Sequence, residues 1–183
     1  KQIQWNCPPP RFVKLNIDGC SKGNLGESGR GGILWNSKGK LVFAFSGYFG
    51  RCTSLQTEAK ALLLGLQLCA QRGFLDSLIV ESDSLLLVHV LLQKVRCPWS
   101  ISGEVERAVQ VARGGLKVVH CYKEANNVAD MLSNVGFTDS GHLAGIYDSF
   151  AGLPFLARGA CHLDKLAFPS FRKFRSLSNF STM

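Results

Sequence analysis

The chain has 183 residues, 46% of them hydrophobic, and a formal net charge of +8 that suits a polyanionic partner, although solubility alone could account for it. This length fits one globular domain with tails, and no apolar run is long enough to cross a membrane. Seven cysteines without a close pair argue against a zinc site or a disulfide framework, and favour free thiols in a reducing compartment.

The N-terminal third predicts an antiparallel meander. Residues 1–11 contain three successive prolines and are expected to form an extended lead-in, because proline joins neither a helix nor a strand ladder. Three short apolar runs predict strands at residues 12–17, 33–35 and 41–47, and the short turns between them make these strands antiparallel. The glycine-rich segment 20–32 is expected to be a loop, as is 49–53. No signal-peptide pattern opens the chain, and because it begins at Lys1 we expect a fragment boundary there.

The rest of the core alternates helices with strands. Apolar spacings of three and four predict a helix from Ser54 to Arg72, which Gly73 ends. The elements expected after it are a strand at 78–80, helices at 84–94 and 101–113, a strand at 116–122, and a final helix capped by Asn126 or Asn127. The prediction is therefore an α/β domain over residues 12–136, with a mixed five-stranded sheet of three antiparallel and two added parallel strands. Residues 137–183 lose periodicity and are expected to be an appended, partly ordered tail.

Four acidic residues lie at the ends of the predicted elements. Asp18 and Asp83 follow strands, Glu58 begins the buried stripe of the first long helix, and Asp130 lies in the last helix. Hard cations such as Mg²⁺ take carboxylate ligands, and two ions about 3.5–4 Å apart can promote phosphodiester hydrolysis. Because sheets of this kind bind ligands beyond the carboxyl ends of parallel strands, we expect the four acids to converge there. For Glu58 alone, a capping or surface role stays open.

The motifs around these acids carry a family resemblance. They are Leu15–Gly19, Gly31–Leu34, Thr57–Leu62, Glu81–Ser84 and Lys123–Asp130, of which the last, with its E-A-N-x-x-A-D pattern, is the most specific. Over about residues 12–136 the chain resembles the ribonuclease H family, and within it the plant reverse-transcriptase-like branch related to retroelements. The resemblance implies a ribonuclease H-like fold and hydrolysis of the RNA strand of RNA–DNA hybrids. It also implies two Mg²⁺ or Mn²⁺ ions, bound by Asp18, Glu58, Asp83 and Asp130.

Other residues are candidates for assisting roles. His120 lies ten residues before Asp130 and is a candidate for the family's catalytic histidine, although a satisfied histidine at a strand edge is an open alternative. The candidates for reading the 2′-hydroxyl of RNA are the backbone near Gly19, Cys20 and Ser21 and the side chain of Asn24. A turn built from small residues would explain the same segment. Lys123 is a candidate for contact with phosphate or product.

Two departures from the family pattern keep a second function open. Leu55 stands where family members often carry an asparagine that touches the hybrid, and it cannot form that hydrogen bond. No Lys/Arg-rich handle lies between Asp83 and the last strand, so we expect weak hybrid affinity. The alternative to an active endonuclease is a catalytically weak or inactive nucleic-acid-binding module of retroelement origin, and a different two-metal exonuclease fits less well. The expected substrate suggests a nuclear location, the expected partner is an RNA–DNA hybrid, and the sequence leaves protein partners open.

Overall fold

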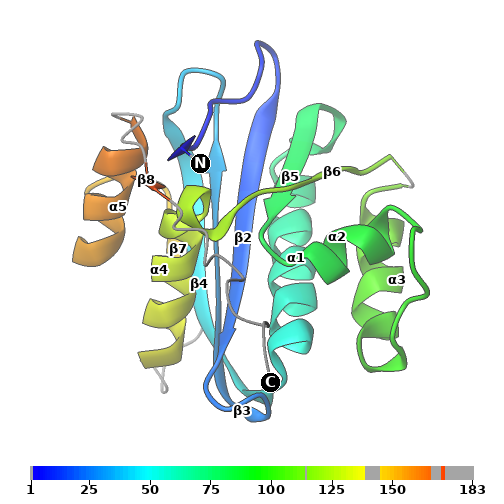
Figure 1. Cartoon of the computed structure of the whole chain (residues 1–183). Helices are drawn as coiled ribbons and strands as arrows, with labels where there is room; N and C mark the ends of the chain where they lie inside the picture. The colour runs from blue at the N-terminus through cyan, green and yellow to red at the C-terminus, as the bar shows by residue number, and fades with distance from the viewer. Residues whose placement is uncertain (1, 114, 139–144, 166–169, 172–183) are drawn as a thin grey trace, which may run out of the picture.

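A computed structural model describes residues 2–113, 115–138, 145–165 and 170–171 (Figure 1). The strands are β1 (Gln2–Ile3), β2 (Val13–Ser21), β3 (Gly26–Trp35), β4 (Leu41–Cys52), β5 (Leu78–Ser82), β6 (Lys117–His120), β7 (Gly145–Tyr147) and β8 (Ser170–Phe171). The helices are α1 (Ser54–Gln71), α2 (Leu85–Leu91), α3 (Ser102–Val111), α4 (Asn127–Thr138) and α5 (Phe155–Lys165), with short 3-10 turns at Leu75–Ser77, Trp99–Ile101 and Lys123–Ala125. Figure 1 shows α1, α2 and α3 on one side of the main sheet and α4 and α5 on the other.

The main sheet has the strand order β6-β5-β2-β3-β4-β7. The predicted antiparallel meander of β2, β3 and β4 is confirmed, and so are the two parallel additions, β5 beside β2 and β6 beside β5. The expected count of five strands was wrong, because β7 pairs antiparallel with β4 as a sixth strand. A three-residue strand is too short to show an alternating pattern. The hydroxyl groups of Ser46 and Tyr147, 2.9 Å apart, join it to β4.

The glycine-rich segment expected to be a loop is largely strand. It supplies the end of β2 and the first part of β3, and β4 likewise continues through the second expected loop to Cys52. The glycines allow close helix packing: a Cβ at Gly29 would lie 2.1 Å from the carbonyl oxygen of Ser133, and one at Gly31 would lie 2.3 Å from its nitrogen. Because these glycines have no side chains, α4 packs directly onto the sheet. Sequence alone does not distinguish glycines that allow such packing from glycines that form a turn.

The alternation of β2 explains why both faces of the sheet are covered. Leu15 and Ile17 are fully buried in the cluster that includes α1, whereas Asn16 and Asp18 point to the α4 side and contact Asn126 and Ser133 there. Fully burying one such aliphatic side chain contributes about 1.5–3 kcal/mol. The strand thus supplies apolar packing on one face and polar groups on the other.

The start of α1 is fixed by a capping box. The Thr53 hydroxyl accepts a hydrogen bond from the Gln56 backbone N–H at 3.2 Å, and the Gln56 side chain accepts one from the Thr53 N–H at 3.0 Å. The predicted limits of this helix are confirmed, since Arg72 is its C-cap and Gly73 follows with φ +75°. The cap matters for function because Glu58 lies one turn further on.

The lead-in and the described part of the expected tail both join the α4 side of the core. Ile3 and Trp5 are buried, and the Trp5 ring lies against Trp35 with centroids 4.9 Å apart. Ala157 and Cys161 of α5 belong to the same cluster. Residues 139–144, 166–169 and 172–183 of the expected tail lie outside the described part of the chain. Among the described helices, none has the length and apolar character needed to span a membrane.

Candidate metal centre

Asp18 lies where the parallel pairing of β2 ends. The register between β2 and β5 runs from Val13↔Leu78 to Ile17↔Ser82, so no residue of β5 pairs with Asp18. Asp83 follows directly after β5. The two carboxylates therefore stand at the carboxyl ends of adjacent parallel strands, as the sequence predicted, and Asp18 is 5% exposed.

Glu58 joins them because Gly19 lets β2 approach α1. A Cβ at Gly19 would lie 2.5 Å from the Glu58 backbone nitrogen, so only glycine fits. The Gly19 N–H donates a hydrogen bond to the Glu58 carboxylate. The other oxygen, Oε2, is buried and has no hydrogen-bond partner among the described residues. A buried acceptor without a hydrogen-bond partner lowers the stability of the fold unless a proton or a cation binds to it.

Asp18, Glu58 and Asp83 form one acidic group. One carboxylate oxygen from each lies within 4.8 Å of the others. Burial raises the pKa of Asp18 to about 7, opposed by a hydrogen bond from Ser133 and reinforced by the charges of Asp83 and Asp130. Burial, followed by the charges of Asp18 and Asp83, raises the pKa of Glu58 well above its usual range, and burial also raises the pKa of Asp83. The group therefore favours bound protons or a bound cation.

The donor set fits a hard divalent cation. Three carboxylates with an orphaned buried oxygen offer the oxygen ligands that Mg²⁺ and Mn²⁺ prefer, and no thiol or imidazole belongs to the group.

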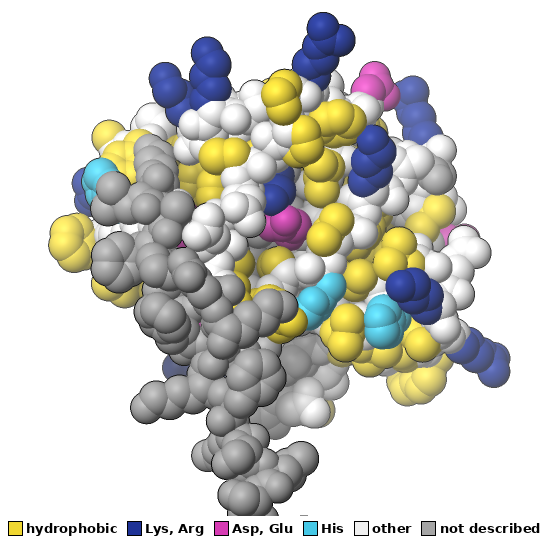
Figure 2. All heavy atoms as spheres, turned by 45° about the horizontal axis from the view of Figure 1, so that its top comes forward, with side chains coloured by type: hydrophobic (Ala, Val, Ile, Leu, Met, Phe, Trp, Pro, Cys, Tyr) yellow, Lys and Arg dark blue, Asp and Glu magenta, His cyan; other side chains and the backbone are white. Residues whose placement is uncertain are grey.

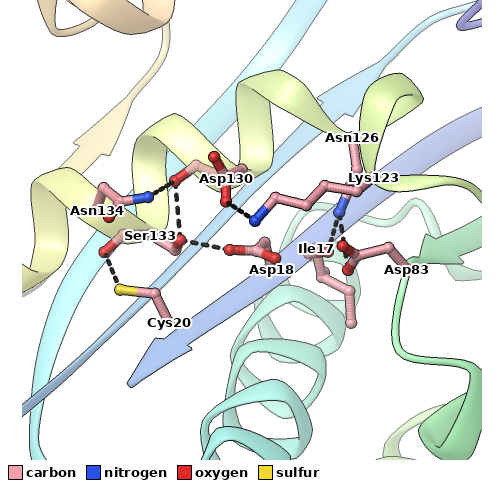
Figure 3. Close-up of polar contacts among 9 residues, drawn as sticks. All are labelled: Ile17, Asp18, Cys20, Asp83, Lys123, Asn126, Asp130, Ser133 and Asn134. Atoms are coloured by element: carbon pink, nitrogen blue, oxygen red, sulfur yellow. Dashed lines mark hydrogen bonds and ion pairs between the residues drawn. The ribbon is translucent and has the colours of Figure 1, made fainter. Parts of the chain in front are cut away.

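Asp130 lies beside this group without belonging to it. Its Oδ1 forms an ion pair with Lys123 Nζ at 3.1 Å, and that hydrogen bond raises the pKa of Lys123. The negative charge of Asp130 still raises the pKa of Asp18 and of Asp83, so Asp130 acts electrostatically on two members of the group. Figure 3 shows Lys123, Asp130, Asp18 and Asp83 around one space, with the lysine side chain pointing to Asp130.

Two residues of this site were missed by sequence reasoning. The Ser133 hydroxyl donates to Asp18 and lies 2.9 Å from the carbonyl oxygen of Asp130 (Figure 3). Asn126 was expected as a helix cap, and its carbonyl does accept the first hydrogen bond of α4 from Asp130. Its side chain, however, donates to the Ile17 carbonyl at 2.8 Å and to Asp83 Oδ1 at 3.5 Å. Asn126 lies inside the most specific sequence motif, and this position could have indicated a role at the site. No feature of the sequence indicated such a role for Ser133.

His120 ends β6 at the same edge of the sheet as the acids. It is half-buried and pairs in register with Ser82, the residue before Asp83. Its ring packs edge-on against Tyr122, with centroids 5.8 Å apart. This is the strand-edge environment that the sequence indicated, and a part in proton transfer stays a prediction.

The candidates for reading the 2′-hydroxyl lie along the end of β2 and the following turn. Their polar side-chain atoms have internal partners: Cys20 Sγ lies 3.4 Å from the Ser133 carbonyl oxygen, and the Ser21 hydroxyl donates to the Cys52 carbonyl at 2.6 Å. Asn24 Oδ1 accepts from the Ser54 N–H at 3.2 Å, which ties the turn to the start of α1. Substrate contact by this segment stays a prediction.

Basic side chains lie on the same face of the molecule as the acids. On the face in Figure 2, lysine and arginine side chains stand around the edge, and a small acidic group with a neighbouring basic side chain lies near the middle. Basic groups on the face that carries the acids suit a polyanion drawn to bound cations.

Comparison with known proteins tests these interpretations. The family model described as reverse transcriptase-like matches residues 16–136. A candidate ribonuclease H protein of Arabidopsis thaliana is 32% identical over 144 residues, covering 75% of this chain and 22% of that protein. Ribonuclease HI of Halobacterium salinarum is 28% identical over 135 residues, covering 70% of this chain and 65% of that protein. The chain thus spans less than two thirds of the length of either relative.

Solved structures agree with the fold. The crystal structure of RNase H1 from Halobacterium salinarum superposes with a TM-score of 0.66 at 28% identity, covering 70% of this chain and 98% of that one. LC11-RNase H1, solved in complex with an RNA/DNA hybrid, superposes with a TM-score of 0.64 at 25% identity, with the same 70% and 98% coverage. The predicted ribonuclease H-like fold is confirmed apart from the strand count. Because the family model covers more than half of the sequence, the chain belongs to the reverse transcriptase-like branch of the ribonuclease H family.

Proposed function

We propose that the chain hydrolyses the RNA strand of RNA–DNA hybrids as an endonuclease that uses two divalent cations. The observation that carries this proposal is the group of Asp18, Glu58 and Asp83, with its orphaned Glu58 oxygen at the carboxyl ends of two parallel strands. Family membership supports it, and so does the structural likeness to LC11-RNase H1, which was solved with an RNA/DNA hybrid.

The residues divide into ligands and substrate contacts. Asp18, Glu58 and Asp83 would hold one Mg²⁺ or Mn²⁺ ion, and Asp18 and Asp130 would hold a second. Bound divalent cations supply Lewis-acid stabilisation of the charge that develops on the attacking and leaving oxygens of a phosphodiester. Lys123, exposed over 69% of its side chain, would contact the phosphate or the product once it leaves Asp130. His120, at the neighbouring strand end, would assist proton transfer.

Discrimination of RNA from DNA would rest on the end of β2 and the turn that leads from it to β3. The backbone of Gly19, Cys20 and Ser21 lies next to the acidic group, and Asn24 is held to the start of α1. A 2′-hydroxyl near these groups could exchange hydrogen bonds that DNA cannot offer.

The deciding assay uses labelled RNA–DNA hybrid, duplex DNA and duplex RNA, each with Mg²⁺ or Mn²⁺. We expect cleavage of the hybrid alone, abolished by Asp83→Asn and unchanged by Asp76→Asn, whose exposed carboxylate lies outside the acidic group. Cleavage that survives Asp83→Asn would remove the site assignment.

A second candidate function is a nucleic-acid-binding module with little or no activity. Leu55 packs against the core cluster of α1 in the place where an asparagine often contacts the hybrid, and Lys123 already neutralises Asp130. Trp99 is 90% exposed and could stack on a base. Tight hybrid binding without cleavage would favour this function, and a salt titration of binding would count the phosphate contacts.

A further inference from the structure

A chain of buried polar groups leads from the lead-in to Asp83. The Trp5 indole N–H donates to Asn16 Oδ1 at 3.1 Å. Asn16 Nδ2 donates to Glu81 Oε2 at 3.0 Å and to Asn126 Oδ1 at 3.1 Å. Asn126 Nδ2 then lies 3.5 Å from Asp83 Oδ1. Trp5 is 5% exposed, Asn16 2% and Asn126 1%, so water does not compete for the two bonds that join these three residues.

The two ends of this chain fix the orientation of the Asn16 amide. An indole N–H can only donate, and an ionised carboxylate can only accept. Glu81 is held as an acceptor by Lys14, whose Nζ lies 2.7 Å from Glu81 Oε1. A flipped Asn16 amide would place its NH₂ group against the Trp5 N–H and its oxygen against the Glu81 carboxylate. Both contacts would be repulsive, so one orientation is left.

The orientation of Asn126 is fixed from two sides, by the Asn16 amide and by the Ile17 carbonyl, which can only accept. Because the NH₂ group of Asn16 faces Asn126, the oxygen of Asn126 must face Asn16. Its own NH₂ group is then directed at the Ile17 carbonyl, 2.8 Å away, and at Asp83. Two amides of fixed orientation thus connect Trp5 and Glu81 to Asp83, a proposed metal ligand.

We infer that Trp5, Asn16 and Glu81 are positioning residues, which act through Asn126 to hold the Asp83 carboxylate toward the other two acids. Trp5 lies outside the stretch matched by the family model, residues 16–136, so the lead-in is part of the framework of the site. This inference rests on the proposed function, because it gives Asp83 the role of a metal ligand. Groups that orient metal ligands typically contribute about 10–100-fold to metal affinity or activity.

The test compares Trp5→Phe with Trp35→Phe. The two rings contact each other at a tilt of 46° in one cluster, so both substitutions remove the same kinds of atoms from the same part of the core. Only Trp5→Phe removes the N–H that Asn16 accepts. Glu81→Gln is a second, isosteric variant, which replaces the carboxylate that can only accept hydrogen bonds by an amide that can also donate them. Its control is Glu106→Gln on the exposed face of α3.

The measurements are Mn²⁺ affinity by titration calorimetry, kcat and KM on hybrid, and thermal stability. We expect Trp5→Phe and Glu81→Gln to bind Mn²⁺ about tenfold more weakly and to lower kcat at unchanged KM. Trp35→Phe should match Trp5→Phe in stability and keep wild-type affinity. Equal Mn²⁺ affinities for the two tryptophan variants would overturn the inference, as would a wild-type protein that binds no Mn²⁺. A wild-type protein that binds Mn²⁺ and cleaves no hybrid would overturn the proposed function alone.

Discussion

Lys123 and Asp130 form the ion pair that separates the fourth acid from the other three. Their charged atoms lie 3.1 Å apart, and the lysine side chain is 69% exposed. Within the described part of the chain, no lysine or arginine forms an ion pair with Asp18, Glu58 or Asp83, and burial raises the pKa of each. The two proposed ions should therefore bind unequally, since the first meets an uncompensated acidic group and the second must displace an ammonium group. The lysine side of this ion pair is open to water, and such a pair costs little to open, so the displacement is feasible.

Replacing Lys123 by methionine should make the weaker Mn²⁺ site bind more tightly while hybrid binding weakens. The reason is that the same ammonium group competes with the second ion and attracts phosphate. Calorimetric titration with Mn²⁺ measures the first effect, and hybrid affinity at fixed salt measures the second. Lys38→Met, in an exposed turn, is the matched control. Unchanged Mn²⁺ binding in Lys123→Met would show that the Lys123 ammonium group does not compete with the second ion.

Stability without metal should fall as the pH rises from 5 to 8. The pKa of Asp18 is about 7 in the folded protein and about 3.9 in an unfolded chain, so the folded state binds the proton more strongly. Its contribution is complete below the unfolded value and is lost as the pH rises through the folded value. The raised pKa values of Glu58 and Asp83 act in the same direction. Urea unfolding across this range measures the effect.

Asp18→Asn supplies the control for that measurement, because it removes one titrating group and keeps a similar shape. The difference in unfolding free energy between wild type and variant should change between about pH 4 and pH 7, the unfolded and folded pKa values of Asp18, and be level below and above that range. Mg²⁺ should raise the melting temperature of the wild type more at pH 8 than at pH 5, because at low pH it competes with bound protons. A larger stabilisation at pH 5 would contradict the assignment.

The strand ends were predictable from the sequence because their signals are local. A short apolar run followed by an acid identified Asp18 and Asp83, and the spacing of α1 indicated that Glu58 faces the sheet. The packing of distant elements was not predictable in this way. Glycines at 29 and 31 indicated a loop, whereas they make room for a helix about a hundred residues later in the chain. The role of Trp5 depends in the same way on a partner that only the fold brings near.

Ser133→Ala should shift the midpoint of the pH dependence of metal binding to a higher pH. The Ser133 hydroxyl donates to Asp18 and lowers its pKa, so its removal leaves the charged carboxylate less stabilised. A hydrogen bond to a charged group contributes about 1.5–3 kcal/mol, which corresponds to about one pH unit or more. Mn²⁺ affinity measured from pH 5 to 9 gives the midpoint, with Ser102→Ala on exposed α3 as the control. A midpoint that stays or moves downward would refute this role.

Gly31→Ala should damage both stability and the site. A Cβ there would lie 2.3 Å from the Ser133 nitrogen and 2.7 Å from the Ala129 carbonyl oxygen, and backbone atoms of a packed helix cannot move aside as a flexible side chain would. Overpacking of this kind costs about 1–3 kcal/mol, and the shift of α4 that relieves it carries Asp130 away from Asp18. Urea unfolding and Mn²⁺ titration should therefore both report losses. Gly103→Ala is the matched control, because nothing lies within 4 Å of its added Cβ on α3. It should stabilise the protein by about 0.5–1 kcal/mol, and a Gly31→Ala protein as stable as this control would show that α4 does not depend on the glycine.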